Sequence, residues 1–178
     1  MSVLPTITTP RLRLRAIGIE DVVELYAVFS DPEVVRYWAR PALTDLAEAV
    51  VMIEQRAREP SMLQWGIVRA QEDRLLGTCT LADIDLAHRR ASIGYALGRD
   101  AWGQGIAREA VRALISYGFE AIELHRIGAD VDPRNARSIR LLEEMGFARE
   151  GLQRECYLVG DEWQDTAMFG LLRREWGG

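Results

Sequence analysis

The sequence contains no lysine, because all 22 of its basic residues are arginine. This absence excludes the lysine of a P-loop, a Schiff-base lysine and a Ser–Lys dyad. The chain also lacks an apolar run of about 18 residues, the length that spans a bilayer. Its first residues, MSVLPTITTPRLRLR, lack a basic start followed by an apolar stretch, which argues against a secretory signal. We therefore expect a cytoplasmic location.

Cysteine and histidine are scarce as well. Cys79 and Cys156 lie far apart among strand-like residues, which favours buried, reduced thiols over a redox pair or a metal site. His88 and His125 stand alone, without another ligand residue at metal-binding spacing. The sequence therefore predicts no metal site.

Charge and composition narrow the class of protein further. The net charge of −5 argues against general nucleic-acid binding, which needs a basic face to displace counterions from phosphates. The same charge would steer a cationic or amine substrate toward the protein. Hydrophobic residues make up 48% and charged residues 28% of the 178 positions, as in ordinary globular proteins. No repeat or linker divides the chain, so we expect one domain over residues 1–178.

The spacing of apolar residues predicts an α/β fold with the order β-α-α-β-β-β-α-β-α-β-β. This order corresponds to a mixed, mostly antiparallel seven-stranded sheet with about four helices on its faces, and residues 30–32, Ser-Asp-Pro, break the first helix. The predicted strands are 11–15, 65–68, 75–81, 91–97, 126–131, 147–158 and 163–172, and the predicted helices are 19–29, 44–58, 105–122 and 135–145.

The segment DAWGQGIAREA, residues 100–110, lies between a predicted strand and a predicted helix. The amides of a first helical turn lack intrahelical acceptors, and glycines let an anion approach them closely. Gly103 and Gly105 could therefore form a phosphate cradle or simply a strand–helix turn, and composition leaves both interpretations open. Arg108 stands where a dinucleotide fingerprint needs a third glycine, and the Gly-Lys-Ser/Thr of a P-loop is absent. We call residues 102–107, WGQGIA, the glycine loop.

The glycine loop resembles the acyl-CoA signature of the GNAT N-acetyltransferase superfamily, Q/R-x-x-G-x-G/A, with Trp102 in the first position. IGYAL before it resembles the strand that lines the pantetheine arm, and DVDPRNARSIRLLEEMGF resembles the following strand and helix. Trp102, TPRLRLRAI at the start and WQDTAMFGLLRREW at the end are similar to the RimJ/RimL-like branch. Members of that branch acetylate α-amino groups of ribosomal proteins, or other amines.

This resemblance implies a sheet that is splayed between the strands at 91–97 and 126–131, with acetyl-CoA entering the gap and no metal. It also implies direct acetyl transfer to an amine in a ternary complex, with the Leu97 amide stabilising the oxyanion. Unpaired backbone groups near Ala96 and Leu97 would bind the pantetheine arm. The residues implied at the cofactor are Ala96, Leu97, Trp102, Gly103, Gln104, Gly105, Ile106, Ala107 and Asn135.

The helix after Asp-Pro-Arg carries two further candidates. Asn135 matches the family position whose side chain reaches the cofactor arm, and it is also a favoured helix cap. The two roles are compatible. Leu142 stands where many relatives carry the tyrosine that protonates the leaving thiolate, and the resemblance to RimL-like enzymes assigns that role to Ser138 instead. The alternative for Ser138 is a small residue bonded to a carbonyl of its own helix.

The general base and the acceptor site are less determined by the sequence. Ser92 stands where relatives often carry a glutamate base, so the base stays unassigned. The carboxylates considered for it, directly or through water, are Asp83, Asp85, Glu150 and Glu155. Composition favours a solvated surface carboxylate for each of them. Tyr37 and Trp38 belong to a segment that borders the acceptor site in relatives, although aromatic packing onto the sheet explains them equally well.

The leading hypothesis is an acetyl-CoA-dependent N-acetyltransferase that acts on a primary amine, with a protein N-terminus as one candidate acceptor. The alternatives are an acetyltransferase for small amines or aminoglycoside-like drugs, and a non-catalytic acyl-CoA-binding domain. We expect neither a nucleic-acid nor a membrane partner. A homodimer is expected by analogy with RimL-like relatives.

Overall fold

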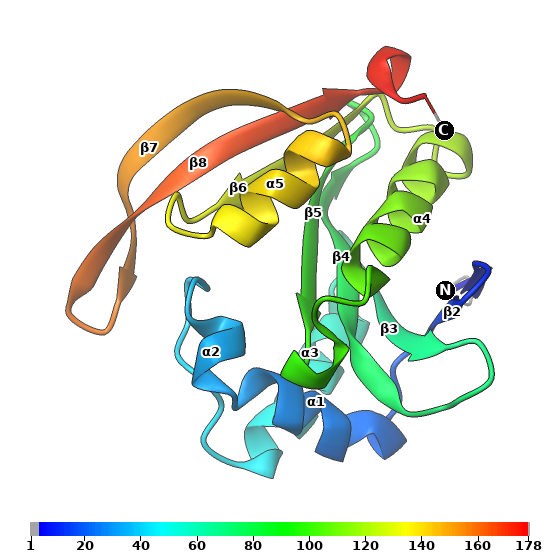
Figure 1. Ribbon diagram of the computed structural model, residues 1–178, viewed down its shortest axis with the longest axis vertical. Helices are drawn as coiled ribbons and strands as arrows, with labels where there is room; N and C mark the ends of the chain where they lie inside the picture. The colour runs from blue at the N-terminus through cyan, green and yellow to red at the C-terminus, as the bar shows by residue number, and fades with distance from the viewer. Residues whose placement is uncertain (1–3, 178) are drawn as a thin grey trace.

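The computed structural model describes residues 4–177, except the side chain of residue 57 (Figure 1). The predicted domain of 1–178 thus includes ends that lie outside the described residues. The strands are β1 (Ile7–Thr8), β2 (Leu12–Arg15), β3 (Leu63–Arg69), β4 (Leu75–Asp85), β5 (Arg90–Leu97), β6 (Arg126–Val131), β7 (Ala148–Val159) and β8 (Glu162–Leu172). The helices are α1 (Val22–Phe29), α2 (Pro32–Val35), α3 (Leu46–Arg58), α4 (Ile106–Glu120) and α5 (Ala136–Glu144), with short 3-10 helices at Ile19–Asp21, Arg99–Ala101 and Arg173–Glu175.

All the strands within residues 4–177 belong to one sheet, in the order β1-β2-β3-β4-β5-β6-β8-β7. Every neighbouring pair is antiparallel except β5 and β6, which run parallel. The mixed, mostly antiparallel sheet with helices on its faces is thus confirmed. The predicted numbers of strands and helices were too low, since the described chain has eight strands and five α-helices.

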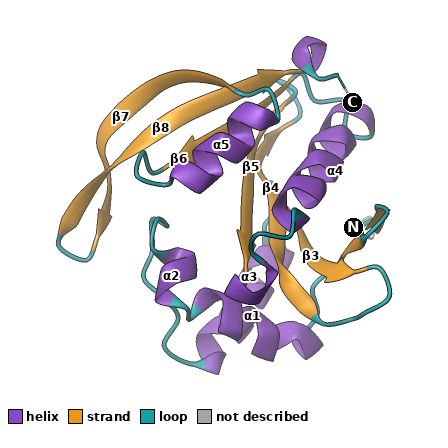
Figure 2. Cartoon of the chain, viewed as in Figure 1, coloured by secondary structure: helices purple, strands orange, loops and turns teal. Residues whose placement is uncertain are grey.

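The sheet separates two hydrophobic cores. Neighbouring residues of one strand contribute to different cores, as the alternation of side chains in a strand requires. In β3, Ile67 packs with α4 whereas Val68 packs with α1 and α3. In β5, Leu97 belongs to the same core as Ile67, and Ala96 to the same core as Val68. Figure 2 shows α1, α2 and α3 gathered around one end of β4 and β5, away from α5.

The two elements missing from the predicted order are both very short. β1 has two residues, paired to β2 at Ile7↔Leu14 and Thr8↔Arg13, too few to produce a periodic pattern. Residues 30–32 do end α1, as predicted, but they also start α2. The Asp31 side chain accepts a hydrogen bond from the Glu33 amide, and Pro32 occupies the first turn, where its missing N–H costs nothing.

A buried ion pair fixes α1 to the edge of the sheet. Both guanidinium Nη atoms of Arg15 in β2 donate to the Asp21 carboxylate at 2.7 Å, and the Gly18 amide donates to it at 2.9 Å. The Asp21 side chain is only 4% exposed. Burial alone would raise the pKa of Asp21, but the hydrogen bonds from Arg15 and Gly18 outweigh it and the pKa lies below its usual value.

We predict that Asp21→Asn lowers the free energy of unfolding by about 2–3 kcal/mol, because it leaves the Arg15 guanidinium without its anion. Since the folded pKa of Asp21 is depressed, its contribution is present above the unfolded pKa of about 3.9 and is lost as pH falls through the folded value. Urea unfolding at several pH values measures both effects. Glu54→Gln, in the exposed Arg58–Glu54 pair, is the control and should change stability by less than about 0.5 kcal/mol. Equal effects of the two variants would contradict the assignment.

Candidate functional site

The centre of the sheet opens where β5 and β6 diverge (Figure 1). The two strands pair only at Arg90↔Arg126, Ala91↔Ile127 and Ser92↔Gly128. Beyond this point β5 continues along β4 as far as Leu97, whereas β6 continues along β8. The sheet is therefore splayed between β5 and β6, the two strands for which the splay was predicted.

The ladder between β4 and β5 decides which backbone groups of β5 face the divergence. The Gly98 amide donates to the Leu76 carbonyl at 2.9 Å. Gly98 and Leu76 are therefore a hydrogen-bonded pair of the antiparallel ladder. Because such pairs alternate, Ala96 bonds to Thr78 of β4, while Tyr95 and Leu97 turn their N–H and C=O groups toward the divergence. Ala96 is thus paired with β4, and the Leu97 carbonyl accepts a hydrogen bond from the Trp102 indole. Contact of Ala96 or Leu97 with the cofactor stays a prediction.

The glycine loop has the backbone geometry of an anion cradle. Gly103 and Gly105 have φ values of 72° and 75°, the left-handed region that glycine adopts without a steric cost. Gly105 is the N-cap of α4 and offers no side chain to the amides of the first turn. A Cβ on Gly103 would meet no heavy atom within 4 Å. The start of α4 therefore has no side-chain cap and the approach at Gly103 is open, which fits a pyrophosphate.

Two arginines and a local turn hold the glycine loop in place. The Gln104 carbonyl accepts a hydrogen bond from Arg11 at 2.9 Å, and its side-chain oxygen accepts one from Arg69 at 2.7 Å. The Gln104 side-chain nitrogen, Nε2, donates to the Asp100 backbone carbonyl. All three contacts lie within the protein, so the Gln104 side chain serves the loop itself.

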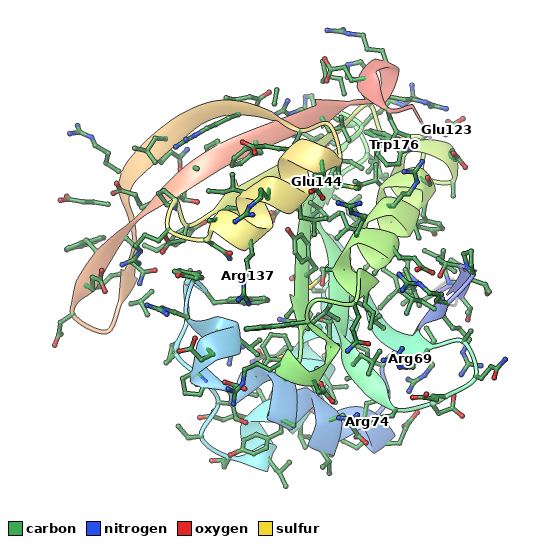
Figure 3. All side chains as sticks on the ribbon, viewed as in Figure 1. Arg69, Arg74, Glu123, Arg137, Glu144 and Trp176 are labelled. Atoms are coloured by element: carbon green, nitrogen blue, oxygen red, sulfur yellow. The ribbon has the colours of Figure 1, made fainter. Side chains whose placement is uncertain are left out.

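Trp102 connects the loop to both sides of the divergence. Its indole N–H donates to the Leu97 carbonyl at 2.8 Å, which anchors the end of β5. The Arg137 guanidinium from α5 lies 5.0 Å from the centre of the Trp102 ring, and Figure 3 shows this side chain leaving α5 toward the loop. Among the described residues Arg137 has no carboxylate partner, whereas Arg11 and Arg108 pair with Glu109 and Glu144. Sequence reasoning missed Arg137, since nothing local distinguishes it from the other arginines.

Ser138 is held at its backbone and at its hydroxyl. The Asn135 side chain accepts a hydrogen bond from the Ser138 amide at 3.1 Å, so the capping role of Asn135 is confirmed. The Ser138 hydroxyl lies 2.8 Å from the hydroxyl of Tyr95 in β5. Burial raises the pKa of Tyr95 to about 12. Leu142 is fully buried in the core.

The carboxylates considered as general bases lie apart from Ser138 in ion pairs or at the surface. Hydrogen bonds from His88 lower the pKa of Asp85, and those from Arg126 lower the pKa of Glu150. A depressed pKa makes a carboxylate a weaker base. The remaining two are exposed residues with positive φ, at Asp83 and Glu155.

The predicted acceptor residues lie in the segment between α2 and α3. Trp38 packs edge-on against Phe29, with ring centroids 5.2 Å apart, and belongs to the core beneath α1. Tyr37 is half-buried, and the Arg36 guanidinium lies 5.5 Å from its ring centre. Trp38 thus packs in the core, with its aromatic contact on α1 rather than on the sheet. Contact with a substrate stays a prediction for both residues.

The remaining sequence predictions concern thiols, metals and membranes. Cys79 is fully buried and burial raises the pKa of its thiol, as expected, but Cys156 is only half-buried. No group of three or more His, Cys, Asp or Glu within the described chain could hold a metal ion. None of the helices in residues 4–177 is long and apolar enough to cross a membrane.

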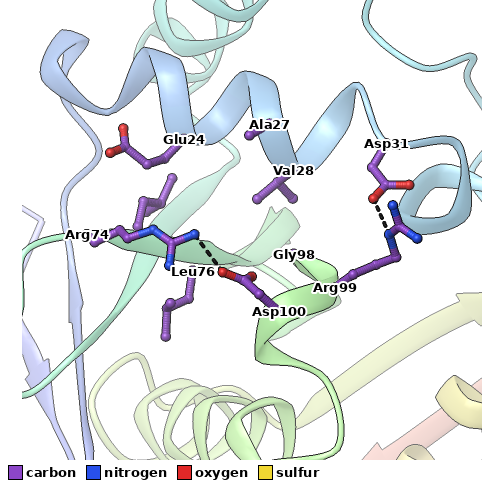
Figure 4. Close-up of a pocket in the computed structure, with 10 residues that line it drawn as sticks. Glu24, Ala27, Val28, Asp31, Arg74, Leu76, Gly98, Arg99 and Asp100 are labelled. Atoms are coloured by element: carbon purple, nitrogen blue, oxygen red, sulfur yellow. Dashed lines mark hydrogen bonds and ion pairs between the residues drawn. The ribbon is translucent and has the colours of Figure 1, made fainter.

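A cavity of about 310 Å³ lies between α1 and the residues that precede the glycine loop (Figure 4). Ion pairs between Arg74 and Asp100 and between Arg99 and Asp31 border it, as the figure shows. These pairs tie the start of the loop to β4 and to the end of α1. None of the residues predicted to bind acetyl-CoA lines this cavity.

Comparison with known proteins identifies the fold and its chemistry. Residues 11–148 match the acetyltransferase (GNAT) domain family. The chain belongs to this family. GNAT enzymes use acetyl-CoA as co-substrate, so this GNAT protein is an N-acetyltransferase that transfers acetyl groups to amines. The suspected resemblance is therefore confirmed.

Two of the following similar proteins cover more than nine tenths of the chain. The uncharacterized N-acetyltransferase p20 of Bacillus licheniformis is 40% identical over 178 residues, covering 98% of this chain and all of that protein. The ribosomal protein uS5 alanine N-acetyltransferase of Escherichia coli is 29% identical over 126 residues, covering 70% of this chain and 65% of that enzyme. The spermidine N-acetyltransferase of Vibrio cholerae, solved with CoA and spermine, superimposes with a TM-score of 0.84 over 94% of this chain and 98% of that one, at 23% identity.

We predict that Gly105→Ala weakens CoA binding about tenfold and destabilises the GNAT domain by about 1–2 kcal/mol, the cost of a left-handed alanine. The added Cβ would also lie 3.3 Å from Arg11 Nη2. Calorimetric titration with CoA and urea unfolding measure the two effects. The control is Gly151→Ala, where a Cβ meets no heavy atom within 4 Å and φ is not positive. Unchanged CoA affinity in Gly105→Ala would contradict the cradle.

Proposed function

We propose that this enzyme acetylates the α-amine of a protein N-terminus by direct transfer within a ternary complex. The observation that carries the proposal is the convergence of three elements on one place: the glycine loop, the open edge of β5 and the start of α5. Acetyl-CoA supplies the activated acetyl thioester. The residues of the chain bind it, orient it and manage protons.

Each of these elements has a distinct task in the proposal. The amides of residues 104–107 hold the pyrophosphate at the N-terminus of α4. The Tyr95 backbone groups and the Leu97 N–H, which face away from β4, bind the pantetheine arm as an added strand would. The Leu97 N–H polarises the carbonyl that becomes negatively charged in the transition state. As the amine nitrogen bonds to the acetyl carbon and the carbon–sulfur bond breaks, Ser138 Oγ–H donates a proton to the leaving sulfur. The proton that the attacking nitrogen loses restores the serine hydroxyl.

Two observations support a protein N-terminus as acceptor. The sequence features of the RimJ/RimL-like branch extend over both ends of the chain, and the E. coli relative is named as an alanine N-acetyltransferase of ribosomal protein uS5. A polyamine is the second candidate acceptor. The net charge of −5 would attract a polycation, and the V. cholerae neighbour is a spermidine acetyltransferase.

We predict that a panel of acceptors, assayed by thiol release and product mass spectrometry, gives the highest kcat/KM with short peptides bearing a free α-amine. The panel contains such peptides, spermidine, spermine and aminoglycosides, and the control peptides have the same sequences with blocked N-termini. Faster turnover of spermidine would replace the N-terminal acceptor by a polyamine. Absence of thiol release with every amine, while CoA still raises Tm, would contradict the proposed catalysis.

A further inference from the structure

The hydroxyls of Tyr95 and Ser138 meet across the divergence of β5 and β6. Tyr95 lies on β5 and Ser138 on α5, the helix that follows β6. Their oxygens are 2.8 Å apart, and the Tyr95 hydroxyl is also 3.5 Å from the Ser138 carbonyl. This side-chain contact therefore joins the two halves of the sheet beyond the last β5–β6 backbone pair, Ser92↔Gly128.

The chemistry of the two groups sets the direction of the hydrogen bond. A phenol is a stronger acid than an aliphatic alcohol, and therefore the better donor of the two. Burial raises the pKa of Tyr95 to about 12, so the phenol keeps its proton at neutral pH. Among the described residues, the Tyr95 hydroxyl lies within hydrogen-bonding distance of two oxygens, both of Ser138. Either hydroxyl could donate on distance alone. With the phenol as donor to Ser138 Oγ, the serine's own proton is directed elsewhere.

The Ser138 backbone is fixed independently. Asn135 accepts the Ser138 amide proton as the cap of α5, so the start of the helix holds the serine Cα while Tyr95 holds its oxygen. A serine at a helix start has several rotamers and can bond to nearby backbone groups instead. An external donor on Oγ removes that freedom.

We propose that Tyr95 is a positioning residue for catalysis, which orients the Ser138 hydroxyl so that its proton points toward the leaving group. This inference rests on the proposed role of Ser138 as proton donor. Leu142, one turn further along α5, is buried in the core and offers no proton. In this chain the phenol comes from β5 and acts through the serine.

The test is a double-mutant cycle with Tyr95→Phe, Ser138→Ala and the double variant. We expect Tyr95→Phe to lower kcat about tenfold, with KM for acetyl-CoA within about twofold of the wild type, because only orientation is lost. Ser138→Ala should lower kcat about 100-fold, and the double variant should equal Ser138→Ala. Tyr26→Phe, which removes a phenol that donates to the Thr44 carbonyl, is the matched control and should leave kcat unchanged.

A second measurement uses the protein without any ligand. Urea unfolding of the wild type, Tyr95→Phe, Ser138→Ala and the double variant should show non-additive effects on stability. Either single substitution breaks the same hydrogen bond. Additive effects on stability would overturn the contact between the two hydroxyls.

The kinetic outcomes separate the two proposals. A Tyr95→Phe enzyme with wild-type kcat beside a slow Ser138→Ala enzyme overturns the role of Tyr95 alone. A double variant slower than Ser138→Ala by the full Tyr95→Phe factor also overturns it, since Tyr95 would then act independently of the serine. A Ser138→Ala enzyme with wild-type kcat overturns the role of the serine itself, and the Tyr95 proposal with it.

Discussion

Backbone N–H and C=O groups inside a sheet must find partners, and the divergence of β5 and β6 leaves one edge of β5 without a neighbouring strand. The ladder with β4 decides that the groups of Tyr95 and Leu97 face this open edge. The placement of the glycine loop after β5 and of α5 after β6 follows from the same divergence. An extended ligand that pairs with the open edge supplies what a missing strand would have supplied.

Side chains keep the open region in a fixed geometry. The Trp102 indole holds the Leu97 carbonyl, the Asn135 side chain holds the Ser138 amide, and the Tyr95 hydroxyl connects to Ser138 across the divergence. Arg137, stacked on Trp102 without a carboxylate partner among the described residues, leaves a positive charge beside the loop. These contacts place donors before the substrates arrive, which is how preorganised electrostatics lowers a barrier.

Features that depend on local geometry could be predicted from the sequence. Gly105 at a positive φ and Asn135 as a cap follow from neighbouring residues alone. The Tyr95–Ser138 contact spans 43 positions, and no local pattern specifies it. The choice between Ala96 and Tyr95 at the open edge needed the register of the β4–β5 ladder, since adjacent residues differ only in which neighbour they face. The start of α2 was missed because the proline that ends one helix also opens the next.

The central claim is that acetyl-CoA lies along the open edge of β5 and on the glycine loop. Titration of the isotope-labelled protein with CoA, followed by backbone amide NMR, tests it most directly. The account predicts that the amides of Leu97 and of residues 104–107 shift together along one saturation curve. Shifts confined to residues 27–31 and 98–100, around the cavity beside α1, with Leu97 and the glycine loop unchanged, would contradict it.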